Sequence, residues 1–148
     1  MRVEKDFKEF IELLNKNKVK YLIVGGYAFA FYAEPRFTKD IDFFVEISET
    51  NAENIAKTLV DFGFESTAVK KDYFQIPGKI IQLGYSPMRI DIITSITGVA
   101  LKDAWKNKKK GKYGDASCYF ISKEDLKKNK KAAGRSKDIA DLELLEKI

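Results

Sequence analysis

Two aspartates, Asp40 and Asp42, flank Ile41 at the start of an apolar run that continues through Val45. This pattern predicts a β-strand. Because side chains alternate along a strand, both carboxylates are expected on one face and Ile41 on the other. A third acid, Asp91, lies among branched apolar residues in a second strand-like run, 89–94. If the two strands pair side by side, the three carboxylates converge at one place.

Three clustered carboxylates favour a divalent cation, since like charges raise one another's pKa unless a cation neutralises them. The sequence has no histidine and a single cysteine, Cys118, which excludes imidazole metal sites and Ser-His or Cys-His nucleophiles. Oxygen ligands favour Mg²⁺ or Mn²⁺. Two such ions, roughly 3.5–4 Å apart, can stabilise the attacking and leaving oxygens of a phosphoryl displacement. The competing interpretation is that the aspartates form the solvated face of an edge strand.

Gly25 and Gly26 separate a strand-like run, 21–24, from an apolar segment, 27–33, that reads as a short buried helix. Glycines lack a Cβ atom, so a phosphate can approach the backbone N–H groups at the helix start, where the helix dipole also favours anions. A simple tight turn is the alternative.

Arg36, Thr38 and Lys39 lie between the glycines and the first aspartate. Their side chains are hydrogen-bond donors suited to a polyphosphate. An ordinary solvated loop would have the same composition, so these residues are candidates for nucleotide binding only in combination with the glycines and the acids.

The elements expected to position these residues are mixed helices and strands. Pro77-Gly78 and Ser86-Pro87 mark turns in the middle of the chain. The order predicts an α+β domain with a mixed, largely antiparallel sheet flanked by helices. Helices are expected at 4–17, 27–33, 53–62, 100–106, 122–131 and 136–148, and strands at 21–24, 39–47, 64–69, 73–76, 79–85, 89–94 and 116–121.

Apolar spacing of three and four residues predicts the buried faces of the first and last helices. The first helix should bury Phe7, Phe10, Ile11 and Leu14, and the last should bury Ile139, Leu142 and Leu145. The basic run 106–112 is expected to be an exposed turn, because it has one aromatic residue at its edge, Tyr113, and no evident platform for stacking bases.

The 148 residues, 45% hydrophobic and 33% charged, predict a single domain over 1–148 with the C-terminal helices, about 122–148, packed on the core. The apolar stretch Ala28–Tyr32 is far too short to span a bilayer, and the charged N-terminus lacks a secretory signal. A cytoplasmic protein is therefore expected. The net charge of +5 suits an anionic ligand, leaves nucleic acid open as a partner, and the many aromatic residues make a homodimer a further hypothesis.

Val24-Gly25-Gly26, a spacer of thirteen residues, Asp40-Ile41-Asp42 and Asp91 together resemble the signature of the polymerase-beta-type nucleotidyltransferase superfamily. The likeness is to its small single-domain prokaryotic branch, related to antibiotic and toxin–antitoxin nucleotidyltransferases. A second stretch, Lys131–Leu142, resembles the C-terminal segment of the same branch, so that the resemblance spans about 20 to 145.

By this resemblance Asp40 and Asp42 hold Mg²⁺ or Mn²⁺, and Asp91 completes the catalytic site and assists the nucleophile. Gly25 and Gly26 contact the triphosphate of an NTP, expected to be ATP. The departure is Gly26 itself, where many members carry a serine whose hydroxyl reaches the phosphates.

Lys131, Arg135 and Lys137 surround the break at Gly134 and are candidates for contacts with substrate or phosphate. The alternative is that these cations are solvated and that the nearby acids, Asp138 and Asp141, merely complement the dipole of the last helix.

Besides a nucleic-acid-binding domain that uses the basic C-terminal half, two functions remain open at this stage. The first is metal-dependent transfer of a nucleoside monophosphate from an NTP to a hydroxyl of an acceptor that the sequence does not identify. The second is a non-catalytic partner protein with the same fold, in a toxin–antitoxin or regulatory pair, because little chain is left to build a separate acceptor-binding domain.

Overall fold

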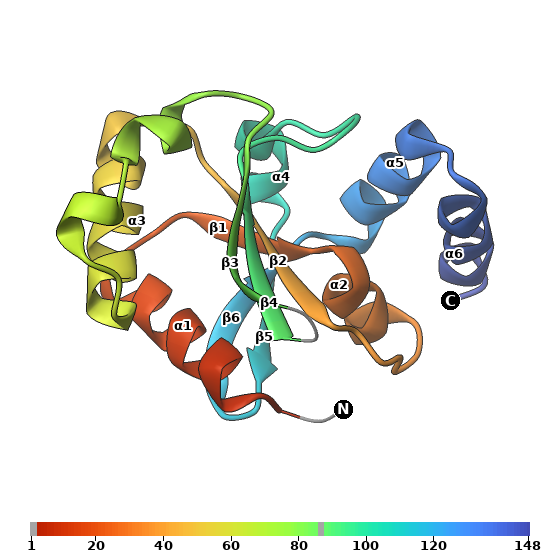
Figure 1. Cartoon of the computed structure of the whole chain (residues 1–148). Helices are drawn as coiled ribbons and strands as arrows, with labels where there is room; N and C mark the ends of the chain where they lie inside the picture. The colour runs from red at the N-terminus through yellow and green to blue at the C-terminus, as the bar shows by residue number, and fades with distance from the viewer. Residues whose placement is uncertain (1–2, 86–87) are drawn as a thin grey trace.

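A computed structural model describes residues 3–85 and 88–148 and contains one six-stranded sheet (Figure 1). Its strand order is β3-β4-β2-β1-β6-β5. β1 pairs antiparallel with β2, as do β3 with β4 and β5 with β6, whereas β2/β4 and β1/β6 are parallel. The expected α+β fold with a mixed sheet is confirmed. The strands are β1 (Tyr21–Val24), β2 (Asp40–Val45), β3 (Ile80–Tyr85), β4 (Met88–Ile93), β5 (Lys109–Tyr113) and β6 (Ala116–Phe120).

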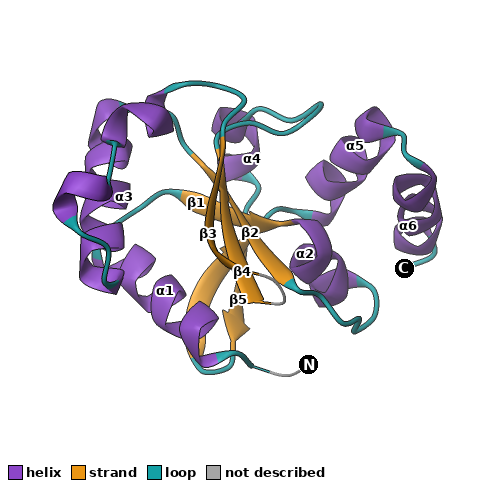
Figure 2. Ribbon diagram, viewed as in Figure 1, coloured by secondary structure: helices purple, strands orange, loops and turns teal. Residues whose placement is uncertain are grey.

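Helices lie on both sides of this sheet (Figure 2). On one side are α1 (Lys5–Lys16) and α3 (Glu49–Phe62), and on the other are α2 (Gly25–Tyr32), α5 (Lys123–Ala133) and α6 (Ser136–Glu146). A further short helix, α4 (Leu101–Lys106), follows the loop after β4. None of the described helices is long and apolar enough to cross a bilayer. The turn expected at Ser86-Pro87 lies outside the described residues.

The core explains which way the acidic strand faces. The four apolar residues expected on α1, Phe7, Phe10, Ile11 and Leu14, are all buried. The Phe10 ring lies 5.5 Å from the ring of Phe43 on β2. Since Phe43 faces α1, its neighbour Asp42 must face the other side of the sheet, toward α2 and α5.

The strands expected at 64–69 and 73–76 are wrong. These segments form two short 3₁₀ helices, η1 (Ser66–Ala68) and η2 (Lys71–Gln75), and η2 contacts α3. β3 is the edge of the sheet, and the segment does not pair with its open side. It buries only Phe74 among the residues of its two short helices.

The exposed turn expected at 106–112 is also wrong in part, because Lys109–Tyr113 forms β5, the edge strand that pairs with β6. Lysines on an edge strand discourage pairing with other chains. The run also lies beside aromatic rings: the ammonium of Lys108 sits 4.2 Å from the ring centroid of Trp105 and 5.6 Å from that of Tyr119. Local sequence could not show the contact with Tyr119, which lies on β6.

The last helix is rotated relative to expectation. Of the three apolar residues expected to be buried, only Leu145 is buried, and Ile139 is 50% exposed. The buried stripe is instead Asp138, Asp141 and Leu145, which are spaced three and four residues apart. The two aspartates turn inward because buried and half-buried cations on α5 and on the 33–39 segment bind them.

Candidate functional site

The paired strands β2 and β4 bring the predicted acids to one face of the sheet. They run parallel, with Asp42 opposite Asp91 and Asp40 opposite Arg89. Residues directly opposite each other on neighbouring strands point to the same face, so Asp40, Asp42, Asp91 and Arg89 form one cluster. We call these four residues the acidic cluster.

Arg89 bridges two of the three carboxylates. Its Nε donates to Asp91 Oδ1 at 2.8 Å, and its Nη2 donates to Asp40 Oδ2 at 2.9 Å. The sequence analysis missed this residue, although its spacing of two from Asp91 on one strand was the available signal. The structure thus departs from the expected arrangement of free carboxylates. Among the described residues, no three Asp, Glu, Cys or His side chains stand as a ready-made metal site.

Asp42 is the electrostatically strained member of the acidic cluster. Burial, followed by the negative charges of Asp91 and Asp40, raises the pKa of Asp42 to about 7, and the charge of Arg89 opposes this shift. Asp40 Oδ1 is buried without a hydrogen-bond partner. A bound divalent cation would stabilise the charged form of Asp42 and would give the unpaired oxygen of Asp40 a partner.

Replacing Arg89 with methionine should increase the electrostatic repulsion among the three carboxylates of the acidic cluster. We expect the melting temperature at pH 8 to fall, because Asp40, Asp42 and Asp91 would then repel one another without the cation that bridges two of them. Millimolar Mg²⁺ should then stabilise the variant more than the wild type, since it supplies the missing positive charge. Circular dichroism melts with and without Mg²⁺ measure both effects. Arg89→Lys is the charge-preserving control, and equal melting temperatures for all three proteins would contradict the assigned role.

The glycine turn packs directly against the acidic cluster. Gly25 begins α2 with φ +69°, and a Cβ atom added there would lie 2.3 Å from Asp42 Oδ2. Val24 pairs with Asp42 across β1 and β2, which sets this close approach. Only glycine fits the backbone angle and the contact together. The start of α2, with its partial positive charge and no side-chain cap, therefore lies next to the acids.

The side chain of Thr38 explains why position 26 holds a glycine rather than a serine. A Cβ atom on Gly26 would lie 2.2 Å from Thr38 Cγ2 and 3.7 Å from Thr38 Oγ1. The side chain of Thr38 therefore fills the space that a serine side chain at position 26 would need. The backbone oxygen of Thr38 also lies 3.4 Å from the hydroxyl of Tyr27.

The three candidate donors of the 33–39 segment do not gather at one place. Thr38 lies against the glycine turn, and the exposed Lys39 lies beside the acidic cluster, since its carbonyl accepts a hydrogen bond from the N–H of Arg89. The Arg36 guanidinium instead binds both carboxylate oxygens of Asp141 on α6, at 2.8 and 3.3 Å.

The C-terminal candidates are exposed. Lys131 and Lys137 lie on the surface, and Arg135 pairs through its Nε with Asp138 Oδ2 at 2.7 Å, closing the capping box of α6. The cation that the structure buries here is Lys130, which the sequence analysis did not single out.

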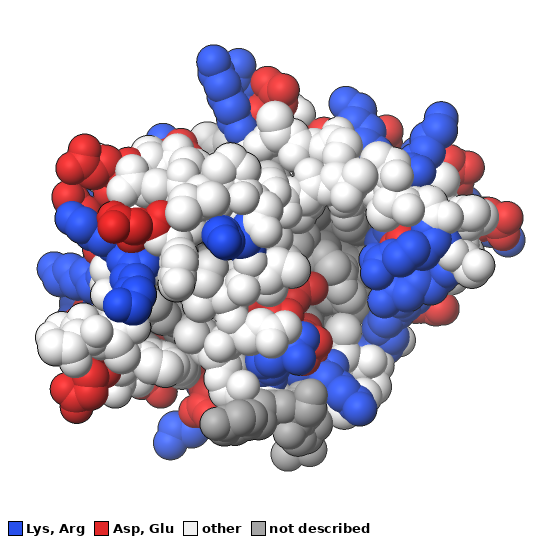
Figure 3. Space-filling model, turned by 45° about the horizontal axis from the view of Figure 1, so that its top comes forward, with Lys and Arg blue, Asp and Glu red and all other residues white. Residues whose placement is uncertain are grey.

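The surface is hollowed beside a group of acidic and basic side chains, as Figure 3 shows. Across the hollow, on the side where α5 and α6 lie, Lys and Arg side chains gather. The loop after β4 reaches α5 in this region, because the Asn129 side chain donates to the carbonyl of Thr97 at 2.9 Å. An anionic ligand in this hollow would thus have cations beside it.

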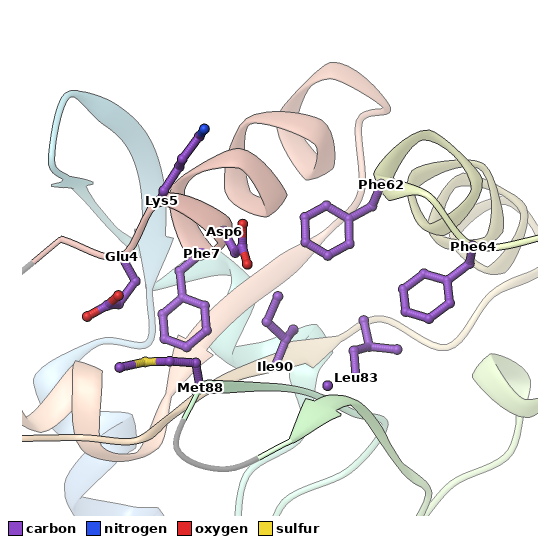
Figure 4. A pocket seen from close by; sticks show the side chains of 10 residues that line it. Glu4, Lys5, Asp6, Phe7, Phe62, Phe64, Leu83, Met88 and Ile90 are labelled. Atoms are coloured by element: carbon purple, nitrogen blue, oxygen red, sulfur yellow. The ribbon is translucent and has the colours of Figure 1, made fainter.

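A separate pocket of about 270 Å³ lies on the opposite face of the sheet (Figure 4). Ile90, the neighbour of Asp91, lines it together with Phe7, Phe62, Leu83 and Met88. The alternation along β4 places these apolar side chains away from the acids. This pocket is therefore distinct from the candidate site.

A protein family described as "Nucleotidyltransferase of unknown function (DUF6036)" matches residues 2–146. No curated protein matches the chain in sequence. The chain is similar in structure to the lincosamide antibiotic adenylyltransferase LnuA with lincomycin bound, with a TM-score of 0.60 and 19% identity over 97% of this chain and 96% of that chain. It is also similar to an antigenic nucleotidyltransferase-like protein from Paracoccidioides brasiliensis, with a TM-score of 0.56 and 13% identity over 97% of this chain and 77% of that chain. At these identities the likeness establishes the fold alone.

Proposed function

Because the chain belongs to the nucleotidyltransferase family of unknown function DUF6036, we propose that it transfers a nucleoside monophosphate from an NTP, most simply ATP, to a hydroxyl group. The observation that carries the proposal is the pairing of Asp42 with Asp91 on parallel strands, directly against the glycine turn that begins α2. The proposal is supported by the contact between the acidic cluster and the start of α2, because a helix start favours anions.

In this proposal Asp40, Asp42 and Asp91 hold Mg²⁺ or Mn²⁺, with Asp40 and Asp91 exchanging contacts with Arg89 for the cation. Carboxylate oxygens suit these ions, which would neutralise charge on the phosphates and on the leaving group. The raised pKa of Asp42 and the orphaned oxygen of Asp40 support the assignment.

The backbone N–H groups at Gly25 and Gly26 and the ammonium of Lys39 would bind the triphosphate. Thr38 is a further candidate beside Gly26, where its methyl group fills the space of the missing serine while its hydroxyl donates to the carbonyl of Arg36. Arg36 is left out of this set, because Asp141 holds its guanidinium. Lys131 is a further candidate for a phosphate contact from the α5 side of the cleft.

The transfer itself is an in-line displacement. The acceptor oxygen forms a bond to the α-phosphorus, the bond from that phosphorus to the pyrophosphate oxygen breaks, and Asp91 accepts the proton of the acceptor hydroxyl. No covalent protein intermediate is required, which agrees with a sequence that lacks histidine.

The acceptor can be a small molecule without any additional domain. LnuA is an adenylyltransferase with lincomycin bound, and the alignment covers 96% of that chain and 97% of this one. A chain of this extent can therefore be compatible with both a nucleotide and a small acceptor, which weakens the argument for a merely non-catalytic partner protein.

Labelled ATP tests the proposal directly. With Mg²⁺ and a panel of acceptors that includes lincomycin, total RNA and extract proteins, we expect label from [α-³²P]ATP to enter one acceptor class. Label from [γ-³²P]ATP should appear only in pyrophosphate, which separates nucleotidyl transfer from phosphoryl transfer. Thin-layer chromatography and gel electrophoresis resolve the products.

The opposite result is equally informative. Failure to bind Mn²⁺–ATP in calorimetry, combined with one stoichiometric protein captured in a pull-down, would favour the non-catalytic partner of a toxin–antitoxin or regulatory pair. Transfer of the γ-label to an acceptor would contradict nucleotidyl transfer, because it would show that the protein transfers a phosphoryl group.

A further inference from the structure

A chain of paired charges, buried at its centre, connects the segment beside the proposed nucleotide site to α6. The Arg36 guanidinium binds Asp141 on α6 through two hydrogen bonds. Asp141 also accepts from the ammonium of Lys130 on α5 at 2.8 Å, and Lys130 lies 3.7 Å from Asp138, which pairs with Arg135. Lys130, Asp138 and Asp141 are each about 95% or more buried.

Burial on this scale requires complete pairing, since an unpartnered buried charge is costly. Burial alone would raise the pKa of Asp141, but hydrogen bonds from Arg36 and Lys130 outweigh it and hold that pKa below its ordinary value. The carboxylate of Asp141 is therefore charged at neutral pH and binds both Arg36 and Lys130. The Arg36 guanidinium is further confined by stacking 3.7 Å from the ring centroid of Phe29 on α2.

The ion pair determines where the 33–39 segment lies. This segment has no regular secondary structure and connects α2 to β2. Arg36 is its anchored residue, and Thr38, two residues later, contacts the glycine turn. Lys39 follows and adjoins β4 through the N–H of Arg89. Without the anchor, the donors of this segment would lose their fixed distance from the helix start and from Asp40.

We propose that Arg36 and Asp141 are positioning residues of the nucleotide site, through which the α5–α6 pair holds Thr38 and Lys39 in place for the triphosphate. This inference rests on the proposed function. It assigns the last helix a role in nucleotide binding although its own exposed cations need not touch the ligand. It also explains why α6 turns Asp141, rather than Leu142, toward the protein.

Two aspartates on one helix supply a matched comparison. Asp141 and Asp138 are both buried and both lie near Lys130, but only Asp141 binds Arg36. We expect Asp141→Asn and Arg36→Met to weaken Mn²⁺–ATP binding roughly 10- to 100-fold, the scale of effect that small displacements of positioning groups produce. Asp138→Asn should change it by no more than about twofold after correction for any unfolded fraction.

A second measurement does not require nucleotide. Hydrogen exchange of the amides in 34–39, followed by mass spectrometry, should accelerate in Asp141→Asn and in Arg36→Met but not in Asp138→Asn. Circular dichroism melts identify any variant that is not folded. Equal effects of the two aspartate substitutions on binding and on exchange would overturn the inference, because the network would then serve stability alone.

The two proposals fail in different ways. If the wild type binds no Mn²⁺–ATP, the nucleotidyltransferase function fails, while faster exchange of 34–39 in Asp141→Asn alone would still establish the anchor. If the wild type binds Mn²⁺–ATP and Asp141→Asn binds it equally well, only the positioning role is refuted.

Discussion

Asp42→Asn should abolish nucleotidyl transfer while making the metal-free protein more stable. We expect activity to fall at least ~10³-fold, because the carboxylate faces Asp91 at the centre of the acidic cluster and loss of a metal ligand removes several kcal/mol of transition-state stabilisation. The amide is nearly isosteric, so the change removes charge and leaves the packing against Gly25 in place. Transfer of label from [α-³²P]ATP, with the acceptor established for the wild type, measures the loss.

The gain in stability follows from the direction of the pKa shift. The folded state raises the pKa of Asp42 to about 7, whereas an unfolded aspartate titrates near about 3.9. Between these values the folded state binds more protons, so the wild type loses stability as pH rises from about 4 to about 7 and does not recover it above. An asparagine side chain does not titrate in this range, so the variant should not show this loss of stability.

Thermal melts at pH 8 and pH 5 test this linkage. The melting temperature of Asp42→Asn should exceed that of the wild type by roughly 3–10 °C at pH 8, and the gap should narrow at pH 5. Mn²⁺ should raise the melting temperature of the wild type alone. The exposed Asp115, paired with Lys8, gives the matched control Asp115→Asn, which should retain activity and show no gain. A destabilised and fully active Asp42→Asn would refute both the role and the electrostatics.

Gly25→Ala should also inactivate the protein, by a steric route. The new methyl group would fall 2.3 Å from Asp42 Oδ2, and the backbone would have to keep φ +69°. The left-handed conformation costs roughly 1–2 kcal/mol for a residue with a Cβ atom. The contact adds to this cost by moving Asp42 or the start of α2, and we expect about a 10²-fold loss of transfer from a misplacement of this size.

The variant Gly134→Ala separates the effect of backbone strain from that of the steric contact with Asp42. Gly134 has nearly the same angle, φ +65°, but its nearest neighbour would lie 3.7 Å from the new Cβ, an ordinary contact. Urea unfolding should therefore show a loss of stability from backbone strain in both variants and a further loss from the steric contact in Gly25→Ala. Only Gly25→Ala should lose transfer and Mn²⁺–ATP binding. Equal activities of the two variants would show that the glycine turn does not shape the site.

Local patterns were sufficient for the strands that carry the acids. The alternation of Asp40, Ile41 and Asp42 identified β2 and the face of its carboxylates, and the run around Asp91 identified β4. The apolar spacing of α1 identified its buried residues. The resemblance to nucleotidyltransferases, carried by the Gly25-Gly26 turn and the acids, is confirmed by the family match. These features depend on residues a few positions apart, where the period of two or 3.6 residues is decisive.

Tertiary structure decided the features that depend on partners far along the chain. The parallel register of β2 and β4 puts Asp42 opposite Asp91, and Arg89 bridges two carboxylates that lie 51 positions apart on those strands. The Arg36 guanidinium, which was expected to donate to a phosphate, donates instead to Asp141, 105 positions away. The same ion pair turned Asp141 of α6 inward, and 66–68 and 71–75 form 3₁₀ helices, the second of which contacts α3. A buried charged side chain must lie beside a counter-charge. The fold, rather than the neighbouring sequence, determines which residue comes close enough to supply it.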